Sequence, residues 1–397
     1  MSGQDPIYLD YAATTPVDER VAERMAACLT RQGVFGNPSS VSHCYGQRAA
    51  ALVGEARAEV AALLGAEPAE VIFTSGATES NNLAILGIAR FYAERGRHLI
   101  TGVTEHKSVL APFKALEAAG WEVTYLSPTA SGAVSVEQLA EAFRPDTALV
   151  SLMHVNNETG VIQDIRALGE MCRERGVRFH VDAAQSVGKL PLDLSAMPLD
   201  SLALSAHKFY GPKGVGALFV RRRPRLRLRP VLHGGGQEGG LRPGTLATHQ
   251  IVGLGEASRL ARDVMASEQA RIQALRDQLW RQLATLPGML LNGEGSPRVS
   301  GILNVSVADV HGESLLAAID DELAVAMGSA CTSAVASPSY VLKALGRSDA
   351  LANSSLRLSL GRFTSEEDIA RTGAHLVSRI RWLRALSPSP GTVLTSS

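Results

Sequence analysis

Short runs of apolar and β-branched residues alternate with longer amphipathic, alanine-rich segments between residues 50 and 220. The apolar runs have the length of buried strands and lie at 70–74, 98–101, 121–126, 148–153, 177–181, 201–205 and 215–220. The segments between them include helical patterns at 80–94 and 107–119. Strands that alternate with helices form mostly parallel sheets covered on both faces. We therefore predict an α/β fold.

The alternation stops between residues 221 and 250, which contain an arginine-rich run followed by several glycines. A long helical pattern follows at 251–286, and the chain then resembles a second α/β unit up to about residue 385. We predict a large domain at 18–262 and a small domain formed by 1–17 together with 263–386. The last residues, 387–397, are rich in serine, proline and threonine and are predicted to form a flexible tail.

Charge and composition exclude several classes of protein. The 397 residues include 39 basic and 39 acidic residues, and zero net charge argues against bulk DNA or an anionic membrane as the main partner. No apolar run approaches the roughly 20 residues that a membrane span needs. The first ten residues do not form a secretory signal. We predict a cytoplasmic protein without membrane association.

The four cysteines, Cys28, Cys44, Cys172 and Cys331, are far apart in the sequence and form no Cys-x-x-Cys pair. Neither a zinc site nor a disulfide framework is indicated, which fits a reducing compartment. The histidines show no metal-binding spacing, so we predict no metal. Each cysteine is then a small buried side chain or a reactive thiol, and the first three are interpreted as structural.

Ligands of parallel α/β sheets bind beyond the carboxyl ends of the strands, so the residues that follow each strand are candidates. Small and hydroxyl residues fill 75–82, before a predicted helix. Free amides at a helix N-terminus bind anions, but Thr78 or Ser80 could instead cap the helix. His106 follows the second strand and is either structural or catalytic. The polar cluster at 154–160 suits either a small ligand or an asparagine-stabilised turn.

Two charged residues follow the next strands. Asp182 ends an apolar strand, where a carboxylate is costly unless it is paired, for example with a protonated ring nitrogen. Lys208 follows the strand at 201–205; lysines are few among the 39 basic residues, and a lysine can lose its proton and form a Schiff base. Together with Ser205 and His207 as a phosphate cradle and a stacking histidine, these residues suit a pyridoxal phosphate site.

The sequence resembles the cysteine desulfurases of the NifS/IscS type. The stretches that carry the resemblance are TSGATES (74–80), TEHK (104–107), HVNNE (154–158), VDAAQS (181–186), SAHK (205–208) and GSACTS (328–333). The similarity extends from residues 8–15 to 360–363, nearly the whole chain. It implies pyridoxal phosphate fold type I, in its class V aminotransferase form, with a large mostly parallel sheet domain, a smaller α/β domain and a homodimer.

The resemblance also implies catalytic roles. Lys208 resembles the Schiff-base lysine that removes the substrate Cα proton, and Asp182 the partner of the pyridine nitrogen. Gln185 resembles the partner of the ring hydroxyl, and His106 the residue that stacks on the ring and assists proton transfer.

The remaining binding roles implied by the resemblance concern two anionic groups. The residues expected to bind the cofactor phosphate are Ala77, Thr78, Ser205, His207 and, from the other subunit, Thr245. Asn157 and Arg357 are expected to bind the substrate carboxylate, which the arginine fork suits physically.

Cys331 has small, polar neighbours, which suit an exposed loop, and its residues alone leave a structural or reactive role open. The resemblance makes it the nucleophile of a long-loop desulfurase. It implies conversion of L-cysteine to L-alanine, with a persulfide on Cys331 that passes to an acceptor protein, either an iron–sulfur scaffold or a tRNA-thiolation enzyme. Gly239 and the tail depart from the family pattern and could alter dimer or scaffold contacts.

Other interpretations remain. The run at 221–229 could contact tRNA or an acidic partner; the favoured interpretation is that Leu226 and Leu228 face inward and the arginines are solvated, so direct nucleic-acid binding is not predicted. A different pyridoxal phosphate reaction, such as amino transfer or selenocysteine cleavage, would not require Cys331. A non-catalytic sulfur-assembly subunit would require neither Cys331 nor Lys208.

Overall fold

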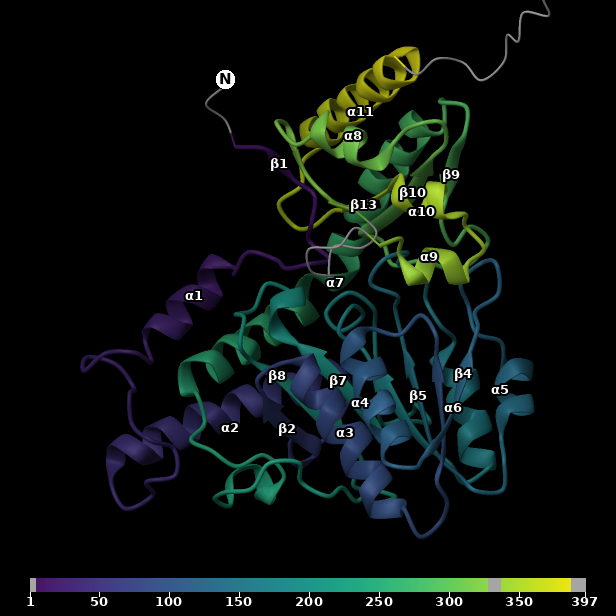
Figure 1. Ribbon diagram of the computed structural model, residues 1–397. Coiled ribbons are helices and arrows are strands. Elements are labelled where there is room, and N and C mark those ends of the chain that lie inside the picture. The colour runs from purple at the N-terminus through teal and green to yellow at the C-terminus, as the bar shows by residue number, and fades with distance from the viewer. Residues whose placement is uncertain (1–4, 328–336, 387–397) are drawn as a thin grey trace, which may run out of the picture.

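A large sheet of seven strands forms the centre of the computed structural model, which describes residues 5–327 and 337–386 (Figure 1). The strand order is β2-β8-β7-β6-β5-β3-β4. The strands are β2 (Val71–Thr74), β3 (His98–Gly102), β4 (Glu122–Leu126), β5 (Thr147–Met153), β6 (Arg178–Asp182), β7 (Ser201–Ser205) and β8 (Gly216–Val220). Strand β8 runs antiparallel to both of its neighbours, and the other pairings are parallel. The predicted mostly parallel sheet is confirmed.

Helices cover both faces of this sheet because successive strand residues point to opposite sides. Leu149 packs with the helices of one face, α3 (Ala77–Tyr92) and α4 (Lys107–Ala118), while its neighbour Val150 packs with the other face. The helices that contribute to that second core include α2 (Cys44–Leu64), α5 (Val136–Ala142), α6 (Ile165–Glu174) and part of α7 (Thr248–Leu283). The inner strands are therefore buried on both faces, as their apolar runs predict, whereas the edge strand β4 is only partly buried.

A second, antiparallel sheet with the order β12-β13-β10-β9 lies above the first in Figure 1. Its strands are β9 (Met289–Leu291), β10 (Ile302–Val307), β12 (Ala326–Met327) and β13 (Ser355–Ser359). The helices of this part are α8 (Gly312–Ala317), α9 (Tyr340–Ala344), α10 (Asp349–Asn353) and α11 (Glu366–Leu386). Near the N-terminus, β1 (Ile7–Tyr8) pairs in parallel with β11 (Leu323–Ala324), and α1 (Glu19–Ala26) follows.

Helix α7 joins the two parts of the molecule. Its first half, including Leu254 and Leu260, packs in the core of the large sheet, and its second half, including Leu275 and Leu279, packs in the core of the second sheet. The predicted domain boundary at residue 262 falls inside this 36-residue helix. The division at that residue stays a prediction, and the change of core occurs a little later, between Met265 and Ile272.

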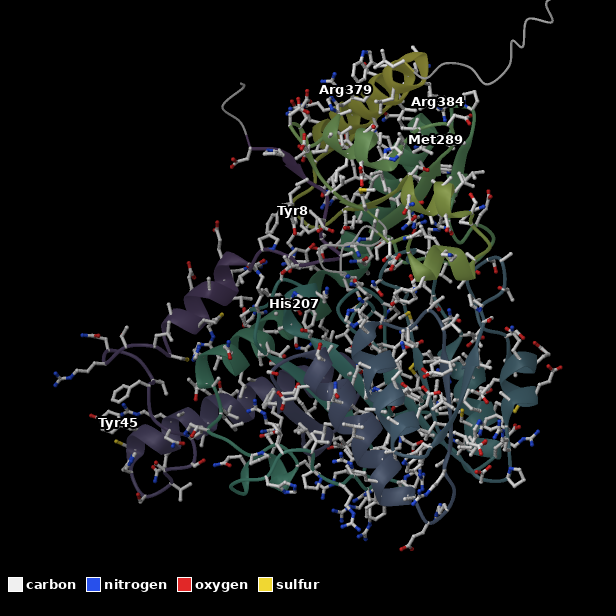
Figure 2. The ribbon with its side chains drawn as sticks, viewed as in Figure 1. Tyr8, Tyr45, His207, Met289, Arg379 and Arg384 are labelled. Atoms are coloured by element: carbon white, nitrogen blue, oxygen red, sulfur yellow. The ribbon has the colours of Figure 1, made fainter. Side chains whose placement is uncertain are left out.

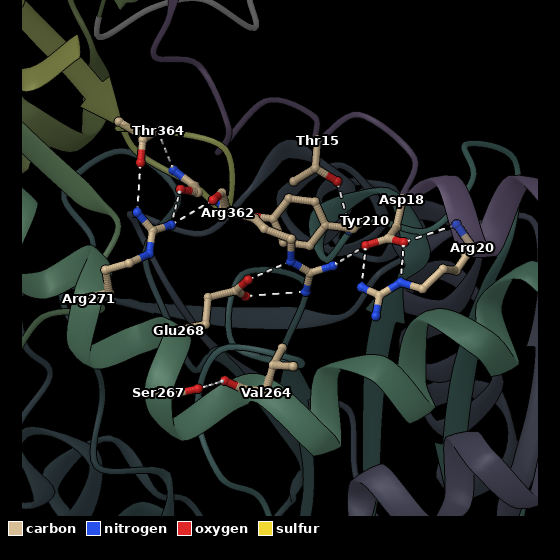
Figure 3. A network of polar contacts seen from close by, with 11 residues as sticks. Thr15, Asp18, Arg20, Tyr210, Val264, Ser267, Glu268, Arg271, Arg362 and Thr364 are labelled. Atoms are coloured by element: carbon tan, nitrogen blue, oxygen red, sulfur yellow. Dashed lines mark hydrogen bonds and ion pairs between the residues drawn. The ribbon is translucent and has the colours of Figure 1, made fainter. Parts of the chain in front are cut away.

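A network of charged residues also connects the parts (Figure 3). The guanidinium of Arg362, after β13, pairs with Glu268 on α7 at 2.5 Å and with Asp18, before α1, at 2.7 Å. Its Cζ lies 4.0 Å from the ring centroid of Tyr210, a cation–π contact. The exposed Arg20 pairs with the other side of Asp18 at 2.9 Å. Three distant chain segments are therefore tied to the loop that follows β7.

The arginine-rich run is only in part as predicted. Leu226 is buried and Leu228 is half-buried against the α3 face, which confirms the inward leucines. The expectation that the arginines are solvated is wrong for Arg221, which is buried and donates to the carbonyl oxygens of Leu194, Met197 and Leu199. Those carbonyls supply the acceptors that a buried guanidinium requires.

The described cysteines divide into two kinds. Cys28 and Cys172 are buried, in accord with a structural role, and burial raises the pKa of both thiols. Cys44 is exposed at the start of α2, so the expectation that it fills a core is wrong. Within 5–327 and 337–386, no cluster of three potential metal ligands occurs and no helix is long and apolar enough to cross a membrane.

Candidate active site

A cavity of about 540 Å³ lies at the carboxyl ends of the parallel strands of the large sheet. Most of the residues predicted for a cofactor and substrate site line it: Ala77, Thr78, His106, Asn157, Asp182, Gln185, Ser205, His207, Lys208 and Arg357. Figure 2 shows His207 between the large sheet and the smaller upper part. Thr245 is exposed and does not line the cavity, and Cys331 lies outside the described residues.

One end of the cavity suits a phosphate. Helix α3 begins at Ala77 after Gly76, which has φ of 150° and provides no side-chain cap. The alternative prediction, a cap from Thr78 or Ser80, is wrong, since the hydroxyl of Ser80 pairs with Thr74 at 2.8 Å. A Cβ on Gly76 would lie 3.4 Å from Ser205 Oγ, so glycine keeps the space between them open. The first helical amides and Ser205 can therefore face an anion together.

Histidine 207 and Lys208 follow β7 in a short 3₁₀ turn. Lys208 Nζ donates to the carbonyl oxygens of Ala12 and Ala13, each at 2.8 Å. Burial, reinforced by the charge of Lys208, lowers the pKa of His207 to about 4, so this imidazole is neutral at pH 7. Its Nδ1 lies 3.1 Å from Thr14 Oγ1. Residues 12–14 of the N-terminal segment thus hold both His207 and Lys208 in position.

Asp182 ends β6 and is buried, with hydrogen bonds from neutral donors. Its Oδ2 accepts from Asn81 Nδ2 at 2.8 Å, and its Oδ1 accepts from the Ala184 amide at 3.0 Å. No ion pair is found for Asp182 among the described residues, so the side chain remains available to a cationic group of a ligand. A carboxylate held in this way suits a protonated ring nitrogen.

Gln185 is fixed on both sides of its amide. Its Nε2 donates to the Ala12 carbonyl at 2.8 Å, and its Oε1 accepts from Lys189 Nζ at 2.8 Å. The second Nε2 hydrogen remains for a ring oxygen, as the predicted role requires. Burial, together with the charges of Lys208 and Arg357, lowers the pKa of Lys189 to about 7. Sequence reasoning missed this second lysine, although lysines are few in the chain.

Arg357 lies on β13, at the side of the cavity formed by the second sheet. It donates to Asp10 at 2.8 Å and to the Asn157 carbonyl at 2.9 Å, and its buried Nε has no partner in the described part of the chain. The guanidinium is held in place and retains donors for a carboxylate. Asp10 was not predicted to act here, although it lies in the first stretch of the family resemblance.

The two interpretations of the cluster at 154–160 apply to different residues. Asn156 Oδ1 accepts from the amides of Glu158 and Thr159 at 3.0 and 2.9 Å, which is an asparagine-stabilised turn. Asn157 lines the cavity next to Arg357. The turn therefore presents a polar residue to the cavity beside Arg357.

These arrangements agree with the comparisons with known proteins. The family described as Aminotransferase class-V matches residues 7–372. The chain belongs to this family. It is 57% identical over 383 residues to a cysteine desulfurase IscS of Shewanella baltica (strain OS223), covering 96% of this chain and 95% of the relative. It is 58% identical to the cysteine desulfurase IscS of Aeromonas salmonicida (strain A449), with the same coverage.

Two solved structures have a similar fold. A NifS-like protein that is 34% identical covers 96% of this chain and 100% of its own, with a TM-score of 0.87. A structure described as SspA in complex with cysteine is 40% identical, covers 90% and 99%, and has a TM-score of 0.79. The predicted fold, family and cofactor, pyridoxal 5'-phosphate, are confirmed. The buried Asp182, the open anion cradle and Lys208 fit that cofactor.

Proposed function

We propose that this protein converts L-cysteine into L-alanine as a pyridoxal phosphate-dependent cysteine desulfurase, with the sulfur held as a persulfide on Cys331. One observation carries the proposal: Lys208, Asp182 and Arg357 face one cavity from three different elements. The relatives named cysteine desulfurase IscS support the choice of substrate. Amino transfer or selenocysteine cleavage would use the same three residues but would not need Cys331.

Each side chain has a defined task in this reaction. Arg357 and Asn157 bind the substrate carboxylate and orient its Cα toward Lys208, which takes the Cα proton. Asp182 holds the proton on the ring nitrogen. The bound cofactor supplies an electron sink at the substrate Cα. The Cys331 thiolate then attacks the substrate sulfur, the carbon–sulfur bond breaks, and protonation of the carbon product yields alanine.

The persulfide sulfur is proposed to pass to an acceptor protein, either an iron–sulfur scaffold or a tRNA-thiolation enzyme. Covalent transfer of this kind needs no free sulfide. We place the reaction in the cytoplasm, since a reducing compartment keeps an attacking cysteine in its thiol form.

Replacing Cys331 with alanine is expected to abolish both alanine and sulfide formation from L-cysteine. Because the persulfide can form only on the thiol, turnover falls by about 10³-fold or more. Alanine and sulfide are measured with and without a reductant, which releases sulfide by reducing the persulfide. Cys44→Ala, which removes an exposed thiol, is the matched control and retains wild-type rates. Full cysteine turnover by Cys331→Ala would assign the site to a different reaction.

We also propose a homodimer in which Thr245 of one subunit contacts the phosphate in the other. Thr245 is exposed and lies outside the cavity of its own chain. Exposed apolar side chains gather in the segment that leads from α1 into α2, at Leu29, Phe35, Val41 and Tyr45. The rings of Phe35 and Tyr45 lie 5.4 Å apart. Such an exposed apolar group is typical of a surface that a partner covers.

Mixing two defective variants tests this shared site. Thr245→Val and Lys208→Ala homodimers are each expected to have low activity at limiting cofactor. A heterodimer combines the Lys208 of one subunit with the Thr245 of the other and so contains one intact site. Activity that appears after the subunits are mixed supports the proposal. No gain in activity, with heterodimers detected by mass spectrometry, would show that Thr245 serves its own chain.

A further inference from the structure

A chain of hydrogen bonds lies directly behind the cavity and joins two of its residues. Asn81, on α3, is fully buried and contacts three side chains. Its Nδ2 lies 2.8 Å from Asp182 Oδ2 and 2.9 Å from Ser108 Oγ, and its Oδ1 lies 3.0 Å from His180 Nε2. Ser108 Oγ in turn lies 2.8 Å from His106 Nδ1. A single amide thus connects Asp182 with His106.

The direction of the bonds around the amide follows from donor counting. An ionised Asp182 can only accept, so Asn81 Nδ2 donates to it and, with its second hydrogen, to Ser108. Asn81 Oδ1 must then accept, which places a proton on His180 Nε2. Burial lowers the pKa of His180 to about 3, so this ring is neutral. Its unprotonated Nδ1 accepts from Ser201 Oγ at 2.9 Å. Both ring nitrogens of His180 and both polar atoms of the Asn81 side chain therefore have a hydrogen-bond partner.

The hydrogen bonds that run from Asn81 through Ser108 determine the tautomer of His106. Because Ser108 Oγ accepts from Asn81, the hydroxyl hydrogen is free to point to His106 Nδ1. The Ser108 backbone amide donates to the same nitrogen at 3.1 Å. Burial lowers the pKa of His106, and with two donors on Nδ1 the neutral ring carries its proton on Nε2. His106 therefore presents a donor, rather than an acceptor, at Nε2.

We propose that Asn81 is a positioning residue that acts on both sides of the cofactor site. It donates a hydrogen bond that orients Asp182 without placing a cation beside it, and through Ser108 it fixes His106 in the Nε2–H form. An aspartate at this position could not donate both bonds and would place a second carboxylate against Asp182. The inference rests on the proposed function only for the direction in which His106 transfers a proton. The tautomer of His106 and the geometry of the Asp182 carboxyl group do not depend on the proposed function.

The tautomer can be measured without any substitution at Asn81. Protein labelled with ¹⁵N-histidine is examined by long-range ¹H–¹⁵N correlation, with and without bound cofactor, and the His106 signals are identified by their loss in His106→Asn. We expect a protonated Nε2 and an unprotonated Nδ1. A proton on Nδ1 in the wild type would overturn the inference. In Ser108→Ala, which removes the hydroxyl donor, the population of the Nδ1–H form is expected to rise.

Substitutions test the contact with Asp182 and the contact with His106 separately. Asn81→Asp is expected to bind pyridoxal phosphate about ten- to a hundred-fold more weakly, because it loses a hydrogen bond to a charged group and adds a like charge. Ser108→Ala is expected to lower kcat by about ten- to a hundred-fold, with cofactor affinity and the KM for cysteine close to wild type. Circular dichroism verifies that each variant is folded.

Asn82→Asp is the matched control. Asn82 is adjacent in sequence, but its side-chain Nδ2 donates within the same helix, to the Thr78 carbonyl oxygen at 2.9 Å. Equal cofactor affinity in Asn81→Asp and Asn82→Asp would overturn the proposed role of Asn81. If the wild type binds the cofactor and shows the expected tautomer but makes no alanine from cysteine, the proposed function fails and the positioning role stands.

Discussion

Replacing Lys208 with alanine is expected to lower alanine formation from L-cysteine by about 10⁴-fold or more while the protein remains folded. Under the proposed mechanism, the variant loses both the amine that binds the cofactor aldehyde and the base that takes the Cα proton. Lys208→Arg is expected to be as inactive, because a guanidinium does not lose its proton. Lys343→Ala, which removes an exposed lysine paired with Asp349, is the control and keeps wild-type turnover.

Borohydride reduction gives this prediction a second readout. In the wild type, reduction is expected to attach the cofactor covalently to the peptide that contains Lys208. Lys208→Ala should bind the cofactor through Asp182 and the anion cradle but release it on denaturation after reduction. Attachment at Lys189 in the wild type would contradict the assignment, and this outcome is a real test because burial lowers the pKa of Lys189 to about 7.

The hydrophobic pattern predicted most of the large sheet because its inner strands are buried on both faces and appear in the sequence as short apolar runs. It did not predict that β8 runs antiparallel, since the run at 215–220 resembles the parallel strands in composition. It also could not predict the burial of Arg221. That guanidinium is accommodated by carbonyls of residues 194–199, which are distant in sequence and come close only in the fold.

The sequence predicted residues that line the cavity where they lie at or just beyond strand ends, as for His106, Asp182 and Lys208. The residues that hold these side chains in place were missed. Asn81 looked like an ordinary helical position, and its contacts with Asp182 and His180 span about a hundred residues of sequence. Asp10 pairs with Arg357 from the opposite end of the chain. Partnerships of this kind depend on tertiary structure, which a local pattern does not encode.

Replacing Arg362 with methionine is expected to destabilise the protein by about 3–5 kcal/mol. The guanidinium is largely buried and pairs with Glu268 and Asp18, whose side chains are 9% and 6% exposed. Methionine fills part of the volume but leaves two buried carboxylates near each other. Arg20→Met is the matched control: it removes the other partner of Asp18, but Arg20 is 56% exposed, so the loss should be within about 1 kcal/mol.

The pH dependence of unfolding distinguishes lost charge pairing from lost packing. Hydrogen bonds from Arg20 and Arg362 lower the pKa of Asp18 to about 2. A lowered carboxyl pKa contributes stability above the unfolded value, about 3.9, and this contribution is lost as the pH falls toward 2. The difference in unfolding free energy between wild type and Arg362→Met should therefore be largest at neutral pH and shrink in acid. A difference that stays constant with pH would indicate packing.

A double variant tests the same explanation directly. If the cost of Arg362→Met comes from an uncompensated charge, then adding Glu268→Gln removes that charge and restores part of the stability, so the two effects are not additive. Arg362 also contacts Tyr210 through its backbone amide, at 2.5 Å from the hydroxyl, and Tyr210 follows Lys208 by two residues. The double variant should therefore regain only part of the stability, because the charge is removed but the cation that packs on Tyr210 is still missing.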